Sequence, residues 1–152
     1  MSSPDQSAKP ADDFHVRLHR LAQADLTEST AQTDGMRRRE AISGKSVGAR
    51  NLWMGQTHVS PGCRSGDHHH GESETAIHVI SGTPEFVFID PASGEETRVR
   101  TGPGDFVFVP PFVPHREENP DPTTEAVVVI ARTTQEAIVV NLPSLRTSGG
   151  PG

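Results

Sequence analysis

The sequence predicts an all-β sandwich or closed barrel, and three observations support that fold class. Short runs of β-branched and aromatic residues dominate after residue 45, whereas the one helical pattern, around residues 18–26, is weak. These runs recur at spacings of about 8–12 residues, with turn-forming residues between them. No repeat or internal linker interrupts the rhythm, so we expect a single domain over residues 14–145.

The expected strands alternate with segments rich in Gly, Pro, Asp and Ser. In chain order they cover residues 51–59, 75–80, 85–89, 97–100, 106–109, 126–131 and 137–140. The segment Asp90-Pro91-Ala92-Ser93-Gly94-Glu95 has the composition of a hairpin loop, because these residue types favour tight turns. Many short strands with turns between them indicate a closed or sandwiched sheet rather than an open one.

Composition excludes several classes of protein. The chain has 152 residues, a formal net charge of −6 and one cysteine, Cys63. A single cysteine excludes an internal disulfide and a multi-cysteine zinc site, and it suits a reducing cytoplasm. An acidic balance argues against nucleic acid as the main partner, because phosphate binding needs a basic face. The run Arg37-Arg38-Arg39 is a local exception, which we interpret as a solvated loop or strand edge.

The ends of the chain dilute its apolar content. Residues 1–13 and 146–152 are expected to be disordered tails. No stretch is long enough to span a bilayer, so we expect no membrane partner and a cytoplasmic location.

Side chains that bind metals gather in two places. His68, His69 and His70 follow one another, Glu74 stands four residues further on, and His115 ends a proline-rich segment. Side chains at i and i+2 of an extended strand leave the same face, so His68 and His70 converge while His69 points away. A turn after His70 could return Glu74 to the same point. We therefore expect one divalent metal ion (Fe, Mn, Ni, Co or Zn), with open positions for substrate.

Two further histidines are candidates for proton transfer. His78 shares the strand parity of Glu74, so it points into the barrel if Glu74 does, as a general acid/base or as a hydrogen-bonded interior histidine. His58 lies on the preceding strand and is a second catalytic candidate. Arg64 and Arg116 flank the two metal-binding segments, where they either clamp a substrate carboxylate or stay solvated.

The first segment resembles the first signature motif of the cupin superfamily. That motif is Gly, five residues, His-x-His, three or four residues, Glu, six residues, Gly. Here Gly62, His68, His70 and Glu74 fit it, but seven residues separate Glu74 from Gly82, one more than in the pattern.

The second segment resembles the second cupin motif: Gly, five residues, Pro-x-Gly, two residues, His, three residues, Asn. Gly104, Pro110, His115 and Asn119 fit, whereas Phe112 replaces the usual Gly. Together the two motifs cover residues 62–119.

The resemblance implies a small double-stranded β-helix, or jelly-roll, with the metal at the wider mouth of the barrel and a homodimeric assembly. It also implies that His68, His70 and His115 are metal ligands. The extra residue after Glu74 leaves three alternatives for the remaining ligand: Glu74, Glu72, or no carboxylate at all.

Three functions remain open for a small-molecule substrate or ligand. The first is an Fe(II) dioxygenase, in which open metal positions accept an organic substrate and O2. The second is a non-redox isomerase, decarboxylase or lyase, with His78, His58 or Glu74 moving the proton. The third is a binding barrel in which the metal only stabilises the fold. The frequency of dioxygenases in the superfamily favours the first.

Overall fold

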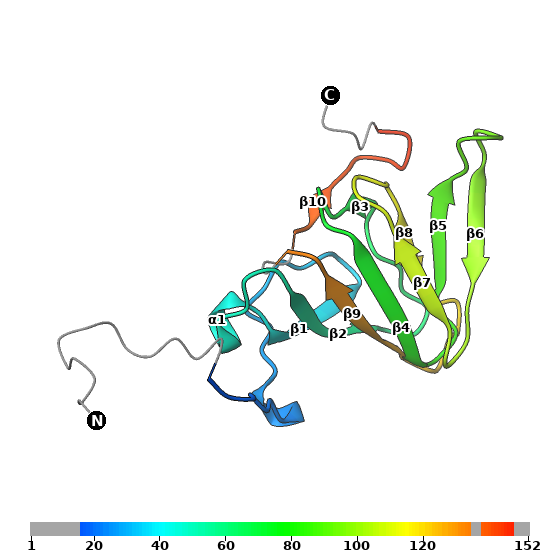
Figure 1. Cartoon of the computed structure of the whole chain (residues 1–152). Coiled ribbons are helices and arrows are strands. Elements are labelled where there is room, and N and C mark those ends of the chain that lie inside the picture. Colours follow the sequence, from blue (N-terminus) through cyan, green and yellow to red (C-terminus); the bar gives the residue numbers. More distant parts are fainter. Residues whose placement is uncertain (1–15, 135–137, 148–152) are drawn as a thin grey trace, which may run out of the picture.

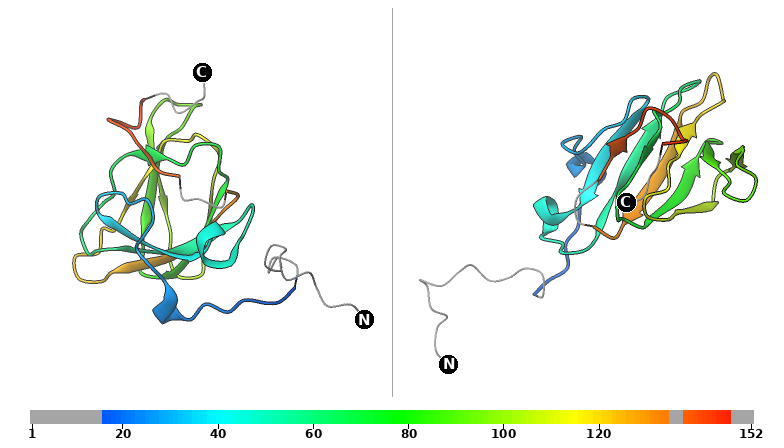
Figure 2. Two further views of the ribbon diagram at one scale, coloured as in Figure 1. Left: turned by 90° about the vertical axis from the view of Figure 1, so that its left-hand side faces the viewer. Right: turned by 90° about the horizontal axis from the view of Figure 1, so that it is seen from above.

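The computed structural model describes residues 16–134 and 138–147, which form two facing layers of antiparallel strands (Figures 1 and 2). The strands are β1 (Met36–Ile42), β2 (Trp53–Val59), β3 (His68–His69), β4 (Thr75–Ser81), β5 (Glu85–Ile89), β6 (Glu96–Arg100), β7 (Phe106–Val109), β8 (Arg116–Glu118), β9 (Ala126–Arg132) and β10 (Val140–Asn141). Of the expected tails, residues 1–13 and 148–152 lie outside the described residues, whereas residues 146 and 147 are described.

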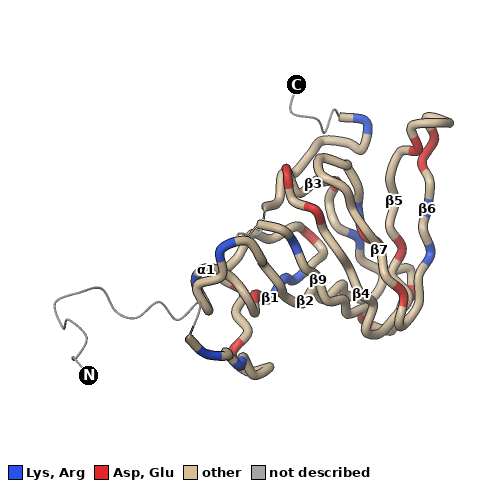
Figure 3. Tube along the Cα trace, viewed as in Figure 1, with Lys and Arg blue, Asp and Glu red and all other residues tan. Residues whose placement is uncertain are grey.

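One layer is a five-stranded sheet in the order β1-β2-β9-β4-β7. The other contains the three-stranded sheet β6-β5-β8 and the short pair β10-β3. A bridge between His68 and His115 joins these two pieces. Basic residues concentrate on β1 and β6 (Figure 3). The all-β expectation is confirmed.

The hydrophobic core fills the space between the layers. Its buried members are Trp53, Ile77, Val79, Phe86, Val109, Val128 and Ile130. Strands β2 and β9 alternate buried and half-buried residues along their whole length, because successive side chains of a strand leave opposite faces. Full burial of one such aliphatic or aromatic side chain contributes about 1.5–3 kcal/mol to folding.

Strands β2, β4, β5, β6, β7 and β9 occupy the expected segments, whereas β1 and β8 were not expected. Of the strand expected at 137–140, residue 137 lies outside the described residues, and β10 begins only at Val140. Strand β1 escapes detection because it contains three consecutive arginines and a glutamate, so its polar residues face both ways. Arg38 and Glu40 point inward and are buried, whereas Arg37 is exposed. The solvated interpretation of the arginine run is therefore wrong for Arg38.

Helical structure is minor within the described ranges. The weak helical pattern at residues 18–26 yields only a three-residue 3-10 turn, Gln23–Asp25, and a four-residue helix, α1 (Gly44–Val47), follows β1. No helix among these residues has the length and hydropathy needed to cross a membrane.

Candidate metal centre

Three buried histidines meet where β3 approaches β8. His68 lies on β3, His70 directly follows it, and His115 directly precedes β8. The backbones of His68 and His115 pair through two hydrogen bonds of 3.0 and 2.9 Å. The ligand atoms of the three side chains lie within 4.8 Å of one another. The fold thus gathers three imidazoles although 44 residues separate His70 from His115 in the chain.

Hydrogen bonds to backbone carbonyls orient all three rings. The Nδ1 atom of His68 contacts the Gly66 oxygen at 2.8 Å, that of His70 the Ile138 oxygen at 2.8 Å, and that of His115 the Val113 oxygen at 3.0 Å. A carbonyl oxygen only accepts, so each Nδ1 carries the proton and each Nε2 keeps a free lone pair. Such backbone partners are typical of metal-ligating histidines.

Burial keeps these imidazoles neutral. It lowers the pKa of His68 to about 2 and that of His115 to about 4, and it holds the pKa of His70 well below its usual value. Neutral rings with free Nε2 atoms are the ligand form that first-row divalent metals require. The residues present therefore fit such an ion.

The structure leaves the expected carboxylate ligand out of this group. Glu72 and Glu74 are both exposed, whereas Ser73 and Thr75 between and after them are buried. The backbone is extended here, so a shift of one residue reverses the direction of the side chain. The group of three histidines contains neither Glu74 nor Glu72.

Thr75 stands at the inward position instead. Counting four residues after His70, which the cupin spacing allows, leads to Thr75 and leaves six residues before Gly82, as the motif requires. Thr75 is 0% exposed, and its Oγ1 atom has no hydrogen-bond partner among the described residues. The extra residue in the sequence was the signal that the carboxylate position holds a threonine.

The two proposed catalytic histidines face away from the barrel interior, which corrects the expectation for both. His78 lies between the inward residues Ile77 and Val79 of β4, and its ring stacks on Phe106 at 4.2 Å. His58 occupies the outer face of β2, where its Nδ1 atom lies 2.9 Å from a Glu125 carboxylate oxygen. His78 was placed by the parity of Glu74, and that parity points outward. For His58 the sequence left open which face of its strand looks inward.

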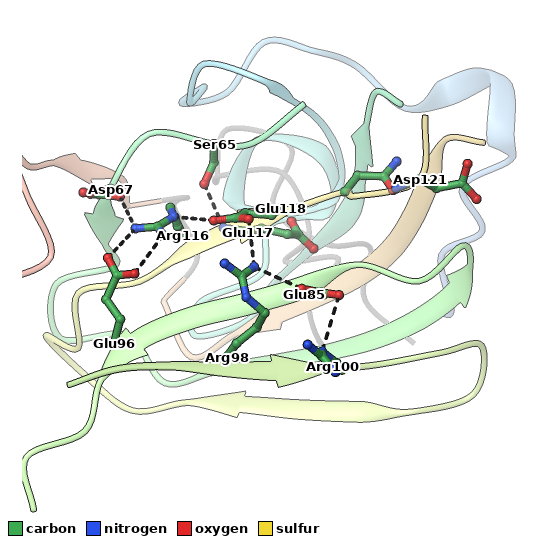
Figure 4. A network of polar contacts seen from close by, with 11 residues as sticks. Ser65, Asp67, Glu85, Glu96, Arg98, Arg100, Arg116, Glu117, Glu118 and Asp121 are labelled. Atoms are coloured by element: carbon green, nitrogen blue, oxygen red, sulfur yellow. Dashed lines mark hydrogen bonds and ion pairs between the residues drawn. The ribbon is translucent and has the colours of Figure 1, made fainter. Parts of the chain in front are cut away.

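The two arginines that flank the motifs do not enter the interior either. Arg64 is exposed. Arg116 donates to Glu118 at 2.6 Å and to Glu96 at 3.3 Å, within the network of ion pairs in Figure 4. Its guanidinium is engaged by the protein's own carboxylates, so it is not a free clamp for substrate.

Two arginines that the sequence did not assign to the interior lie there. Arg38 on β1 is 0% exposed and Arg132 on β9 is 1% exposed. Burial lowers the pKa of Arg38 to about 10 and that of Arg132 to about 9, so both remain cationic at pH 7. Burial also raises the pKa of Glu117 to about 7, against the opposing effect of Arg38. In a sequence, a charged residue at an inward strand position has the same pattern as a solvated one. For that reason neither arginine was assigned to the interior.

An apolar cavity reaches one of the three histidines, His115. Its volume is about 630 Å³, and His115 is its one imidazole lining residue. The remaining walls come mainly from β5, β6, β7 and the proline-rich turn that precedes His115: Phe86, Val87, Phe88, Ile89, Pro91, Val99, Phe106, Val107, Phe108, Val109, Pro110, Phe112, Val113 and Pro114. A concave apolar site with few polar groups is the usual form of a small-molecule pocket.

Phe112 shapes this turn at a position where the cupin motif has glycine. Its φ of 62° lies in the left-handed region, which side chains with a Cβ rarely adopt. Its backbone N–H donates to the Gly71 oxygen at 2.8 Å, and its ring lies 5.8 Å from that of His69. His69 is thus held against the turn through Phe112 and stays outside the group of three ligands.

Solved structures share the fold at low sequence identity. Peruvianin-I, a cysteine peptidase from Thevetia peruviana latex, is 15% identical with a TM-score of 0.68 over 91% of this chain and 83% of that one. The polyketide cyclase RemF from Streptomyces resistomycificus is 22% identical with a TM-score of 0.64 over 88% of this chain and 90% of that one.

Oxalate decarboxylase from Lactobacillus farciminis, in a formate complex, is 17% identical with a TM-score of 0.65. The match covers 78% of this chain but only 34% of that one, so the present chain spans about a third of that enzyme. No curated protein sequence matches the chain. The family profile of the cupin domain matches residues 55–131, half of the sequence, and these residues include all three histidines. The chain therefore belongs to the cupin-domain family.

Proposed function

We propose that this protein is a mononuclear metal enzyme that acts on a small organic substrate, and that it works as an Fe(II) dioxygenase. His68, His70 and His115 would hold the metal through their Nε2 atoms. A divalent ion held by three protein ligands would keep open positions for an organic substrate and O2.

The observation that carries the proposal is the hydrogen bonding of the three histidines. All three Nδ1 atoms are bound to backbone carbonyls, which directs three neutral Nε2 atoms into one space. No hydrogen bond to these Nε2 atoms is formed by the described residues, so their lone pairs are available to a metal ion.

The rest of the interior would bind and shield the substrate. The apolar cavity beside His115 would take its organic body and exclude water. When bound, the metal ion would supply electron transfer and orientation of the substrate. Neither His58 nor His78 takes part, since both lie on the outer face of the five-stranded sheet.

A non-redox isomerase, decarboxylase or lyase is the second candidate, and the buried arginines favour it. Two guanidinium groups in a water-poor interior would stabilise negative charge that develops on a substrate oxygen. For either enzyme we propose a cytoplasmic location, which the single cysteine suits.

The test measures turnover of the Fe(II)-loaded protein with and without O2. An oxygen electrode records the O2 consumed. We would screen catechol-, thiol- and diketone-type substrates. Substrate loss that stops under anaerobic conditions and consumes O2 supports the dioxygenase. Equal turnover without O2 supports the non-redox enzyme, and ligand binding without any turnover identifies a binding barrel instead.

A further inference from the structure

Arg132 is a buried cation whose hydrogen-bonding capacity is unused. It is 1% exposed, and its Nε, Nη1 and Nη2 atoms all lack hydrogen-bond partners among the described residues. None of the ion pairs found within those ranges includes Arg132. An unpaired buried charge is strongly unfavourable, typically by several kcal/mol, so a partner is expected.

The neighbours of Arg132 do not supply that partner. It pairs across the sheet with Trp53 on β2 and with Thr75 on β4. Its guanidinium carbon lies 4.9 Å from the Trp53 ring centroid, and the indole N–H is held by Glu40 at 3.0 Å. A cation–π contact stabilises the guanidinium by less than burial of its charge costs. Thr75 offers only an Oγ1 atom, which is itself unpaired.

Arg132 lies beside the candidate metal centre through its strand partner. That partner, Thr75, stands at the position of the carboxylate in the cupin motif. A fixed cation at this point disfavours a metal cation at the three histidines, because like charges repel. An anion between Arg132 and the metal would relieve both problems.

We propose that Arg132 binds the carboxylate of an organic ligand beside the three histidines, with Thr75 as a further hydrogen-bonding group. This inference rests on the proposed metal centre and names its ligand class. The planar guanidinium fork matches a carboxylate in a bidentate pair. Thr75 replaces the carboxylate of the cupin motif, so the protein itself brings no anion to this point. The apolar cavity at His115 accommodates the rest of the ligand.

The test compares benzoate with benzamide, which has the same ring but no charge. Calorimetry on the Co(II)-loaded protein would measure the affinity for both, in the wild type and in Arg132→Met. Arg64→Met is the matched control, because Arg64 is exposed. We expect benzoate to bind the wild type at least 10-fold more tightly than benzamide. Arg132→Met should lose that preference, and Arg64→Met should keep it.

A second readout is the coupling between the two ligands. By thermodynamic reciprocity, benzoate should tighten Co(II) binding to the wild type by the same factor by which Co(II) tightens benzoate binding. Arg132→Met should bind Co(II) as tightly as the wild type or more tightly, and its coupling should be about 1. Imidazole, a neutral metal ligand, should bind both proteins equally.

Specific outcomes overturn the inference. It fails if benzoate does not bind the wild type, if benzamide binds equally well, or if Arg132→Met keeps the benzoate affinity. If Arg132→Met does not fold, Arg132→Lys decides, because a lysine keeps the charge but not the fork, and unchanged benzoate affinity would refute the bidentate pair. Failure of the proposed metal centre is separate: the wild type would then bind no Co(II), while benzoate binding could still be measured.

Discussion

At the scale of single residues, the ligand histidines differ from the others in what their Nδ1 atoms contact. His68, His70 and His115 each meet a backbone carbonyl, whereas the Nδ1 of His69 accepts a hydrogen bond from the Gly71 N–H at 2.9 Å. The same residue type thus uses Nδ1 as a donor in three rings and as an acceptor in His69. Among the histidines that the structure describes, His68, His70 and His115 turn Nε2 toward a common point.

Replacement of His115 should remove the metal. We expect His115→Ala to weaken Fe(II) or Mn(II) binding by about 100-fold or more, because one of three ligands is lost and two neutral imidazoles hold a divalent ion weakly. Elemental analysis after dialysis would measure it, with circular dichroism to check the fold. His69→Ala is the control and should retain about one equivalent. A fully metallated His115→Ala protein would refute the site.

Replacement of Glu74 should leave metal binding unchanged. The side chain is exposed and outside the group of three histidines, so Glu74→Ala and Glu72→Ala should change metal affinity by less than about 2-fold. Competition with a chromophoric chelator would measure it, with His68→Ala as the positive control. A 10-fold loss in either variant would show that a carboxylate reaches the ion after all.

At the scale of elements, the register of β4 and the connection between β8 and β9 position the site. Asn119, directly after β8, is 1% exposed and donates through its Nδ2 atom to the backbone oxygens of Val59, Ser60 and Thr124 at 3.1, 3.3 and 2.8 Å. This one amide therefore ties the end of β2 to the segment that leads into β9.

Loss of this amide should destabilise the fold. We expect Asn119→Ala to lower the free energy of unfolding by about 2–4 kcal/mol, because it leaves buried carbonyl oxygens unpaired. Denaturant unfolding followed by Trp53 fluorescence would measure the change. Asn141→Ala is the control, since residue 141 on β10 is exposed. A change under about 0.5 kcal/mol at Asn119 would contradict the role assigned to it.

At the scale of the whole molecule, buried titratable groups link stability to pH. The lowered pKa values of His68, His70 and His115 mean that the unfolded chain binds more protons below about pH 6.5. Glu117 opposes this, because its pKa is raised to about 7 and the folded chain then keeps a proton that the unfolded chain loses. The three histidines together change the stability with pH more than Glu117 does.

The metal-free protein should therefore lose stability as the pH falls from about 6.5 to about 4.5. Each histidine contributes about 1.4 kcal/mol per pH unit in this window, and Glu117 offsets one of the three. Calorimetric melting temperatures across the window would show the decline, and His68→Asn should make it shallower. A flat profile would mean that the three imidazoles are not buried together.

The outer face of the five-stranded sheet carries exposed apolar side chains. Ile80 is 48% exposed, Phe106 76% and Phe108 58%, on the neighbouring strands β4 and β7. The two phenylalanines also border the rim of the cavity at His115. Such a patch on a small protein is typical of an interface. The homodimer that the cupin resemblance implied stays a prediction, and we assign it to this face.

Light scattering coupled to gel filtration would test the dimer. We expect the wild type to have twice the mass of one chain, and Ile80→Glu to have the mass of one chain, because a buried unpaired carboxylate opposes association. Leu52→Glu, at an exposed site before β2, is the matched control and should remain dimeric. A monomeric wild type would contradict the assignment.

Much of the fold could be predicted from the sequence because strand patterns and turn residues act locally. The segments at β2, β4, β5, β7 and β9 alternate or run apolar between turns. Strand β1 could not be predicted, because Arg38 and Glu40 occupy inward positions and a local sequence pattern does not show which charged side chains are buried.

By itself, the sequence determined the all-β class, the cupin motifs and the identity of the three histidines. These depend on spacing along the chain, where His-x-His places two rings on one side of an extended segment. The tertiary structure decided everything that depends on strand parity. It turned Glu74, His58 and His78 outward and placed Thr75 inside, and it brought Arg132 to the centre. A shift of one residue in register reverses a side chain, and only the pairing of distant strands fixes that register.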